Sequence, residues 1–247
     1  MNEARRLEGK VAIVTGAARG QGEAEARLMA ANGAMVILTD VLAEQGRAVA
    51  ADMGDSARFV EHDVASEEGW ARVVEAAVSA FGSVDVLVNN AAISRPLKLE
   101  DTDLATYQHV IDVNQVGVFL GMRAVLEPMK RAGGGAIINV ASVAGLQGTS
   151  TLFAYTASKW AVRGMSKSAA LELARYNIRV TVINPGVIDT PINHDNPDKM
   201  NQVLVKTTPM RRMGEPSEIA EAVLFVASDA ASFATGADFT IDGGMSI

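Results

Sequence analysis

The chain has no cysteine among its 247 residues and only three histidines. The missing thiols exclude disulfide bonds, thiolate catalysis and thiolate metal ligands. The histidines are His62, His109 and His194, and no two of them have the spacing that places metal ligands on one helix or loop. We therefore expect no metal site, and the composition suits a reducing, cytoplasmic environment.

Long apolar runs and an excess of positive charge are also missing. No stretch approaches the roughly 18 apolar residues that a membrane helix needs. Residues 1–9, MNEARRLEG, lack the apolar core of a secretory signal. The formal net charge is −7, whereas nucleic-acid binding needs a basic face. We expect neither a membrane nor a nucleic acid as a partner.

Short segments rich in Val and Ile alternate with longer, alanine-rich segments along the whole chain. The expected strands are 10–15, 35–40, 58–63, 84–89, 136–141, 180–184 and 238–242, and the expected helices are 20–32, 67–82, 104–132, 153–176 and 216–228. Several of the strands are apolar almost without alternation, as in parallel sheets that are covered on both faces. The pattern predicts an α/β fold of βαβ units, with helices on both faces of one parallel sheet and a single domain over residues 1–247. The segment 191–214 contains three prolines and reads as an irregular substrate lid within that domain.

A glycine-rich loop follows the first expected strand and opens the first expected helix. It reads TGAARGQG, with Gly16, Gly20 and Gly22 placed where the backbone could turn tightly and approach a pyrophosphate. The helix N-terminus would offer free N–H groups to that anion. The loop therefore predicts a dinucleotide site, in which Arg19 and Gln21 also contact the cofactor.

Asp40 ends the second expected strand, 18 residues after Gly22. A carboxylate there would accept hydrogen bonds from the adenosine ribose and repel the 2′-phosphate of NADP. Arg19 argues the other way, because a guanidinium can pair with that phosphate. The strand end fixes the position of Asp40, whereas the long Arg19 side chain can swing into solvent. We therefore expect NAD rather than NADP, with Val41 beside the ribose.

Two more strand ends offer groups to the adenosine half of the cofactor. Asp63 and Val64 follow the third expected strand, and Asn90, Ala91 and Ala92 follow the fourth. The same residues could equally form ordinary turns at strand ends.

Tyr155 and Lys159 lie four residues apart in a helical stretch, so both side chains share one face. Ser142 follows the fifth expected strand, at the sheet edge where ligands of open α/β folds bind. A free tyrosine has a pKa of ~10 and is a poor base at neutral pH. We expect the nearby Lys159 ammonium to lower the Tyr155 pKa, so that Tyr155 acts as base or acid while Ser142 holds the substrate oxygen. Without the cofactor loop, the pair could be an ordinary feature of a helix surface.

Asn114 interrupts the pattern of the long helix 104–132. Asparagine competes with helical backbone hydrogen bonds, so it could mark a local break that binds a water leading to Lys159.

Together these motifs resemble the short-chain dehydrogenase/reductase family over essentially the whole chain. The loop matches its TGxxxGxG motif, Asn89-Asn90-Ala91 its NNAG motif, and Tyr155 and Lys159 its YxxxK motif. The resemblance implies a seven-stranded Rossmann sheet of order 3-2-1-4-5-6-7 and a homotetramer with the long helices and last strand at its interfaces. It also implies that Asn114, Ser142, Tyr155 and Lys159 are catalytic, with a proton relay through Tyr155, the ribose, Lys159 and a water on Asn114. The segment implied to hold the nicotinamide comprises Pro185, Gly186, Val187, Ile188 and Thr190.

The chain departs from the family pattern at two positions. Gln21 stands in place of the usual isoleucine, and Ala92 stands in place of the usual glycine. Neither change removes a catalytic group, so we expect activity to survive.

Within the family, the chain is most similar to bacterial NAD-dependent hydroxysteroid and cyclic secondary-alcohol dehydrogenases. The expected substrate residues are Ser94, Ala144, Leu146, Leu152, Phe153 and Val187. Most are apolar, which favours a small hydrophobic alcohol or ketone, although Arg95 could pair with a carboxylate. One alternative is a 3-oxoacyl-carrier-protein reductase, which Gly133 and Tyr176 disfavour because basic groups are expected there. Another is a scaffold that binds NAD without reacting.

Overall fold

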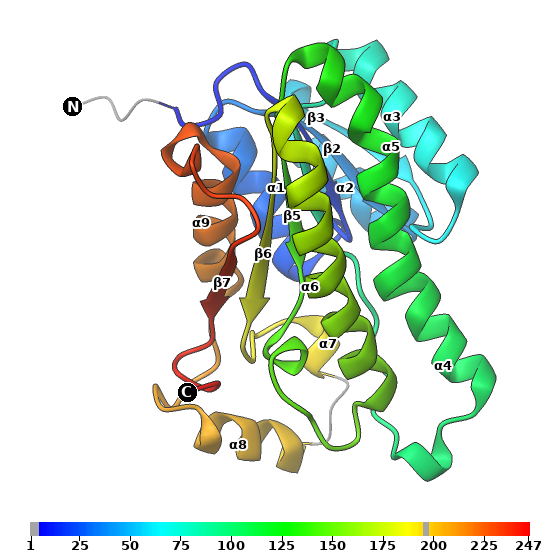
Figure 1. Cartoon of the computed structure of the whole chain (residues 1–247), viewed down its shortest axis with the longest axis vertical. Coiled ribbons are helices and arrows are strands. Elements are labelled where there is room, and N and C mark those ends of the chain that lie inside the picture. Colours follow the sequence, from blue (N-terminus) through cyan, green and yellow to red (C-terminus); the bar gives the residue numbers. More distant parts are fainter. Residues whose placement is uncertain (1–4, 195–197) are drawn as a thin grey trace.

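Seven parallel strands form one sheet in the order β3-β2-β1-β4-β5-β6-β7 in the computed structural model, which describes residues 5–194 and 198–247 (Figure 1). The strands are β1 (Val11–Thr15), β2 (Met35–Asp40), β3 (Ala57–Glu61), β4 (Val86–Asn89), β5 (Gly135–Val140), β6 (Ile178–Pro185) and β7 (Asp238–Ile241). This order confirms the expected Rossmann topology. The order reverses between β1 and β4, and such a switch point opens a crevice at the carboxyl ends of the strands.

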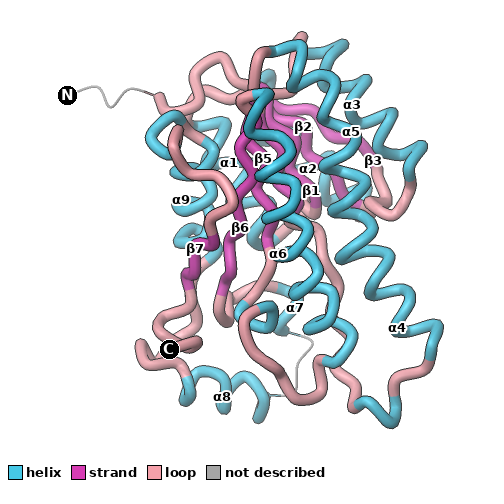
Figure 2. Tube along the Cα trace, viewed as in Figure 1, coloured by secondary structure: helices cyan, strands magenta, loops and turns pink. Residues whose placement is uncertain are grey.

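Two layers of helices cover the sheet, as expected for parallel strands that are apolar throughout (Figure 2). One face carries α1 (Gly20–Ala31), α2 (Ala43–Met53) and α9 (Pro216–Ala227), and the other carries α3 (Glu67–Phe81), α5 (Gly117–Ala132) and α6 (Phe153–Leu173). The sequence reading missed α2. Its Gly46 lies so close to Phe59 of β3 that a Cβ would be 2.0 Å from the ring, so glycine here permits close packing on the sheet.

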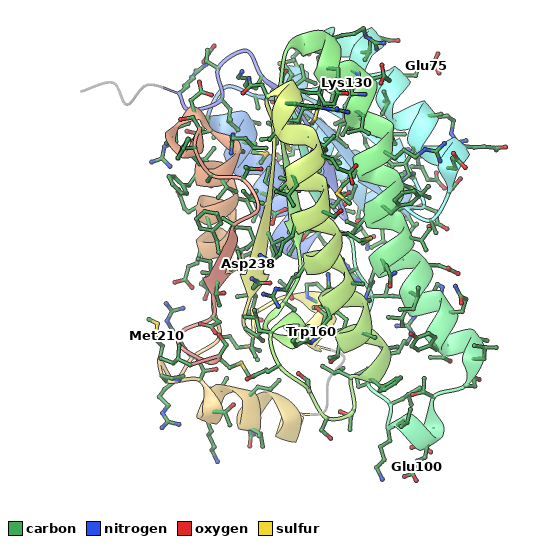
Figure 3. The ribbon with its side chains drawn as sticks, viewed as in Figure 1. Glu75, Glu100, Lys130, Trp160, Met210 and Asp238 are labelled. Carbon is green, nitrogen blue, oxygen red and sulfur yellow. The ribbon has the colours of Figure 1, made fainter. Side chains whose placement is uncertain are left out.

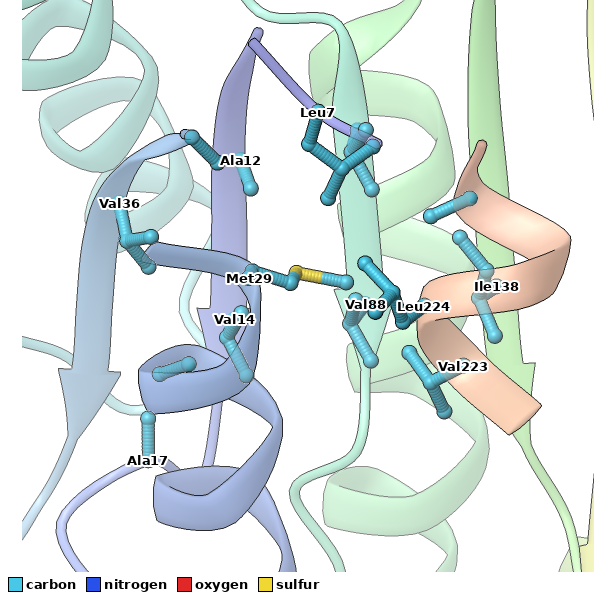
Figure 4. Close-up of a cluster of buried hydrophobic side chains, with 14 of the residues drawn as sticks. Leu7, Ala12, Val14, Ala17, Met29, Val36, Val88, Ile138, Val223 and Leu224 are labelled. Atoms are coloured by element: carbon cyan, nitrogen blue, oxygen red, sulfur yellow. The ribbon is translucent and has the colours of Figure 1, made fainter. Parts of the chain in front are cut away.

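The core beneath α1 and α9 fixes the first helix against the sheet. Met29 of α1 lies among Val14 of β1, Val88 of β4 and Leu224 of α9, all of them buried (Figure 4). Burying such a side chain contributes roughly 1.5–3 kcal/mol. This packing holds the N-terminus of α1 at the carboxyl edge of β1.

The long helix expected over 104–132 is interrupted. It consists of α4 (Leu104–Ile111), a π-helical turn at Asp112–Val116 and α5. Asn114 is buried within this turn. The helix therefore departs from α-helical geometry at the residue where the sequence suggested a local break. Single π turns inside α-helices are frequent at functional sites.

We expected the segment 191–214 to be irregular, but it contains the helices α7 (Pro191–His194) and α8 (Asp198–Thr207). Of its three prolines, Pro191 opens α7, Pro209 follows α8, and Pro197 lies outside the described residues. The two ends of the segment meet, since Asp189 N–H donates to Gly214 O and Gly214 N–H donates to Val187 O, both at 2.9 Å. In Figure 1 α8 lies at the end of the molecule where the strand arrows point.

The edge strand β7 is tied to α6 by charge. Asp238 accepts hydrogen bonds from Arg163 at 3.2 Å and from Lys167 at 2.6 Å (Figure 3). Among the residues that the structure describes, no helix combines the length and apolar character needed to cross a membrane.

Candidate active site

A cleft of about 780 Å³ opens at the carboxyl ends of the strands. Its volume lies within the usual range for small-molecule sites. It is lined by most of the residues predicted to bind a cofactor or substrate: Gly16, Arg19, Gly20, Gln21, Gly22, Asp40, Val41, Asp63, Val64, Asn90, Ala91, Ala92, Ser94, Ser142, Ala144, Leu152, Tyr155, Lys159, Pro185, Gly186, Val187, Ile188 and Thr190. The fold therefore brings together strand ends that lie up to 174 positions apart, from Gly16 to Thr190.

The glycine loop fits an anion at the start of α1. Gly16 and Gly20 have φ angles of 66° and 62°, a backbone conformation that favours glycine. At Gly22 a Cβ would lie 2.3 Å from Gly16 O, so no larger residue fits in this turn. No side chain caps the helix start, and its first N–H groups are therefore available to a phosphate in the cleft.

Gln21 connects this loop to the residue that follows β4. Its Nε2 donates to Glu25 at 2.9 Å and to Asn90 Oδ1 at 3.0 Å. Asn90 Nδ2 in turn donates to Thr15 O at 2.9 Å. Where the family pattern has an aliphatic side chain, this chain has a polar bridge that links α1, β1 and β4.

Asp40 lies at the carboxyl end of β2 with its carboxylate oriented by the backbone. Oδ2 accepts a hydrogen bond from Ala18 N–H at 3.1 Å, and Oδ1 accepts one from Leu42 N–H at 3.0 Å. Each oxygen retains a further lone pair for a ligand hydroxyl. Arg19 also lines the cleft but is exposed, as its length allows.

The predicted catalytic side chains converge at the other end of the cleft. Ser142 and Tyr155 are hydrogen-bonded through their side chains, and Lys159 Nζ lies 5.5 Å from the centre of the Tyr155 ring. Lys159 is buried and donates to Val140 O at 2.8 Å. The i, i+4 spacing of Tyr155 and Lys159 on α6 thus places both groups beside the end of β5.

The charge balance of this group differs from the sequence expectation. Burial raises the pKa of the Tyr155 hydroxyl above its ordinary value, and the hydrogen bond with Ser142 lowers it less than burial raises it. Burial also lowers the pKa of Lys159 to about 7. The expectation that Lys159 lowers the Tyr155 pKa is wrong for the chain by itself, because both groups are desolvated and the ammonium form is disfavoured.

Asn114 is not in the cleft wall but supports it. Its Oδ1 accepts from Ile93 N–H at 2.8 Å, and its Nδ2 donates to Ile93 O at 2.9 Å and to Ser158 Oγ at 3.2 Å. Ser158 Oγ donates to Tyr155 O at 2.7 Å. The Asn114 amide thereby links the segment after β4 to the helical turn that carries Tyr155.

Two predicted substrate residues lie outside the cleft lining. Phe153 begins α6 two residues before Tyr155, so its side chain leaves the opposite side of the helix, where its ring centre lies 6.2 Å from that of Tyr107. Leu146 is half-buried behind the loop that follows Ser142.

Several other lining residues were not predicted from the sequence. They include Ile93, Pro96, His109, Val113, Val143, Gln147, Gly148, Thr149, Ser150 and Met245. The expected lid segment 191–214 contributes Ile192, Asn193 and Leu204 to the lining. Ile93 and Val143 directly follow strand-end motifs, a signal that could have identified them.

Comparison with known proteins bears on this site. Residues 16–246 match the family described as enoyl-(acyl carrier protein) reductase. The chain is 48% identical over 239 residues to the 3-alpha-(or 20-beta)-hydroxysteroid dehydrogenase of Mycobacterium tuberculosis, covering 97% of this chain and 90% of that one. It is 43% identical over 248 residues to the trans-4-hydroxycyclohexanecarboxylate dehydrogenase of Sinomonas cyclohexanicum, covering 97% and 93%. It is 44% identical over 245 residues to the NADP-dependent (R)-specific alcohol dehydrogenase of Lentilactobacillus kefiri, covering 97% of each.

The chain belongs to the short-chain dehydrogenase/reductase family. It is therefore an oxidoreductase of a family that uses NAD(P) and acts on CH–OH groups. In the described ranges, no cluster of three or more His, Cys, Asp or Glu side chains could hold a metal ion.

Proposed function

We propose that the protein is an NAD-dependent dehydrogenase that interconverts hydrophobic cyclic secondary alcohols and ketones. The observation that carries this is the convergence of Tyr155, Ser142 and Lys159 at one end of the cleft, with the glycine loop and Asp40 at the other. A bound reduced nicotinamide supplies the hydride in ketone reduction. The glycine loop fits the diphosphate of a dinucleotide cofactor. The uncapped start of α1 and the glycine turn leave room and N–H donors for it.

Tyr155 acts in this proposal as the proton donor to the ketone oxygen. Its raised pKa keeps the hydroxyl protonated in the chain alone, which suits the direction of reduction. Ser142 holds the same oxygen by a hydrogen bond. Lys159 places a proton-carrying group behind Tyr155, and its pKa of about 7 lets it take up or release a proton near neutral pH.

The proposed substrate class follows from the apolar side chains in the cleft wall. Ile93, Val113, Val143, Leu152 and Val187 supply apolar surface. Two relatives named above are a hydroxysteroid and a hydroxycyclohexane carboxylate dehydrogenase, both of which act on ring alcohols. These names and the apolar walls favour ring alcohols over an acyl thioester on a carrier protein.

The cofactor preference rests on Asp40. Its oriented carboxylate would repel a 2′-phosphate, whereas the exposed Arg19 has no comparable anchor on the strand. The relative from Lentilactobacillus kefiri is NADP-dependent, so membership of the family does not decide the cofactor, and the proposed preference for NAD depends on Asp40 alone.

Substitution of the proton donor tests the proposal. Tyr155→Phe should lower kcat for reduction of a cyclic ketone by about 10²–10⁴-fold, the usual contribution of a general acid. NADH binding, followed by fluorescence titration, should persist. Tyr107→Phe is the matched control, because Tyr107 lies outside the cleft lining, and it should keep wild-type turnover.

Three outcomes oppose the proposal. Unchanged turnover in Tyr155→Phe removes its chemical basis. Tight NAD binding without turnover of any cyclic, steroidal or open-chain alcohol identifies a scaffold instead. Turnover confined to acyl-thioester ketones with NADPH identifies a 3-oxoacyl reductase.

We also propose that the protein assembles as a homotetramer. Large apolar side chains are exposed on α5 and α6, where Phe119, Trp160 (labelled in Figure 3) and Leu171 lie, and also at Phe225, which contacts Phe239 of β7, and at Phe233. Exposed apolar side chains favour burial against another subunit. Light scattering of the purified protein measures the mass directly.

A further inference from the structure

The segment that follows β4 forms a fixed wall of the cleft. Asn114 binds both backbone polar groups of Ile93, as described above. Further along, Leu97 N–H donates to Thr151 O at 2.8 Å, so that Leu97 and Leu152 form a parallel bridge. Arg95 lies between these two attachment points and lines the cleft. Its backbone is therefore held on both sides.

The carboxylates of the cleft lining lie at one end, which also carries Arg19. The carboxylates in its lining, Asp40 and Asp63, follow β2 and β3 on one side of the switch point. Arg95 follows β4 on the other side, where the lining contains no Asp or Glu among the described residues. His109 of α4 also lines the cleft and offers a second possible N–H donor.

The Arg95 guanidinium is not used in a structural ion pair within the described ranges. Its Nη1 donates to Ser94 O at 3.0 Å, which occupies one of its five N–H groups. Other arginines of this chain are paired with carboxylates: Arg27 with Asp52 at 2.6 Å and Arg212 with Glu218 at 2.7 Å. A planar guanidinium with free donors is suited to bind a carboxylate through two parallel hydrogen bonds.

We propose that the preferred substrate is a cyclic hydroxy or oxo acid, whose carboxylate binds Arg95 while its carbinol or carbonyl carbon lies at Tyr155. This rests on the proposed function, which it deepens by assigning the distal end of the substrate. The ring fills the apolar part of the cleft between the two polar contacts. Arg95 is then a specificity-determining residue and takes no part in the chemical step.

A pair of ketones that differ only in charge tests the assignment. We suggest 4-oxocyclohexanecarboxylate and 4-oxocyclohexanecarboxamide, each reduced with NADH, with cyclohexanone as the uncharged reference. The wild-type kcat/KM should favour the carboxylate by about tenfold, the low end for a hydrogen bond to a charged group. The difference should lie mainly in KM, because the contact is equally present before and during hydride transfer.

Arg95→Gln should bring this ratio close to one, and Arg95→Lys should retain part of it. Arg47→Gln removes the same charge from an exposed residue of α2 outside the cleft lining and should keep the wild-type ratio. As a test that needs no variant, the wild-type preference should shrink between low salt and 0.5 M salt, since an exposed ion pair is screened.

The outcomes separate this inference from the proposed function. A wild-type ratio near one, together with normal reduction of cyclohexanone, overturns the role of Arg95 and leaves the dehydrogenase proposal intact. A preference that persists in Arg95→Gln also overturns it. If all three ketones and a steroid ketone are inert, the proposed function fails and this inference fails with it.

Discussion

Gln21 and Glu25 form a hydrogen bond of 2.9 Å in which the glutamate is fully buried. The carboxamide donates from Nε2 to Glu25 Oε1, and Glu25 Oε2 has no hydrogen-bond partner. Burial raises the pKa of Glu25 to about 8, and the Gln21 bond offsets only part of that effect. Glu25 is consequently a neutral acid at pH 7, on α1 and hydrogen-bonded to Gln21 of the glycine loop.

This proton makes the stability of the fold depend on pH. In the unfolded chain Glu25 loses its proton near its ordinary pKa of 4.5, whereas in the folded chain it holds the proton to about pH 8. Between these values the folded state binds one more proton, so the free energy of unfolding falls as pH rises. Glu25→Gln, which keeps the shape and remains neutral, should match the wild type near pH 4.5 and exceed it at pH 8.5. The gain should be on the order of a few kcal/mol, because each unit of pKa difference is worth about 1.4 kcal/mol.

Urea unfolding of both proteins at the two pH values measures this difference. Glu23→Gln is the matched control, since Glu23 lies on the same helix in a partly exposed ion pair with Arg27. It should leave the pH dependence of the wild type in place. Parallel stability curves for Glu25→Gln and wild type would show that Glu25 is ionised in the folded chain.

The parts of this structure that follow from local pattern could be predicted from the sequence. The β-branched runs and the glycine loop predict a parallel sheet of βαβ units and one end of the cleft, because right-handed crossovers leave few arrangements, whereas the strand order came from the family resemblance. The Gln21–Glu25 pair could not be predicted in this way. Its two residues were visible as an i, i+4 pair, but their burial depends on how α1 packs against the sheet and α9.

Burial also explains the error in the Tyr155 pKa. The sequence predicts the Tyr155 pKa from a nearby charge, whereas desolvation dominates, and desolvation is a property of the whole fold.

The expectation that the segment around α8 is irregular rested on its prolines. Proline is tolerated at helix starts and common after helix ends, so Pro197 and Pro209 are equally compatible with a helix between them.

Asp40 offers a direct test of cofactor selection. The wild type should have a higher kcat/KM with NADH than with NADPH, because the oriented carboxylate repels the 2′-phosphate. Asp40→Ala should reduce this preference by about tenfold or more, the effect expected from losing a charged contact worth at least 1.5 kcal/mol. Steady-state kinetics with both cofactors and one ketone give the ratio.

A matched charge change elsewhere controls for global electrostatics. Asp52→Ala removes a carboxylate that is 70% exposed on α2, and it should leave the cofactor ratio unchanged. A wild type that works better with NADPH would refute the cofactor proposal, and Arg19 would then be the residue to examine first.

Thr151 carries backbone strain in the loop that is hydrogen-bonded to Leu97, two residues after Arg95. Its φ of 65° is unfavourable for a β-branched residue, yet its carbonyl accepts the Leu97 hydrogen bond that fixes the wall. Asparagine tolerates this conformation far better, so Thr151→Asn should raise the free energy of unfolding by about 1 kcal/mol. Thr151→Val keeps the branched Cβ and should give no such gain, which separates relief of strain from loss of the hydroxyl. Equal stabilities of the two variants in urea unfolding would mean that the strain is relaxed in solution. Thr151→Asn should also keep the Leu97 contact and the wild-type KM, because the backbone carbonyl makes that contact and only the cost of the conformation has changed.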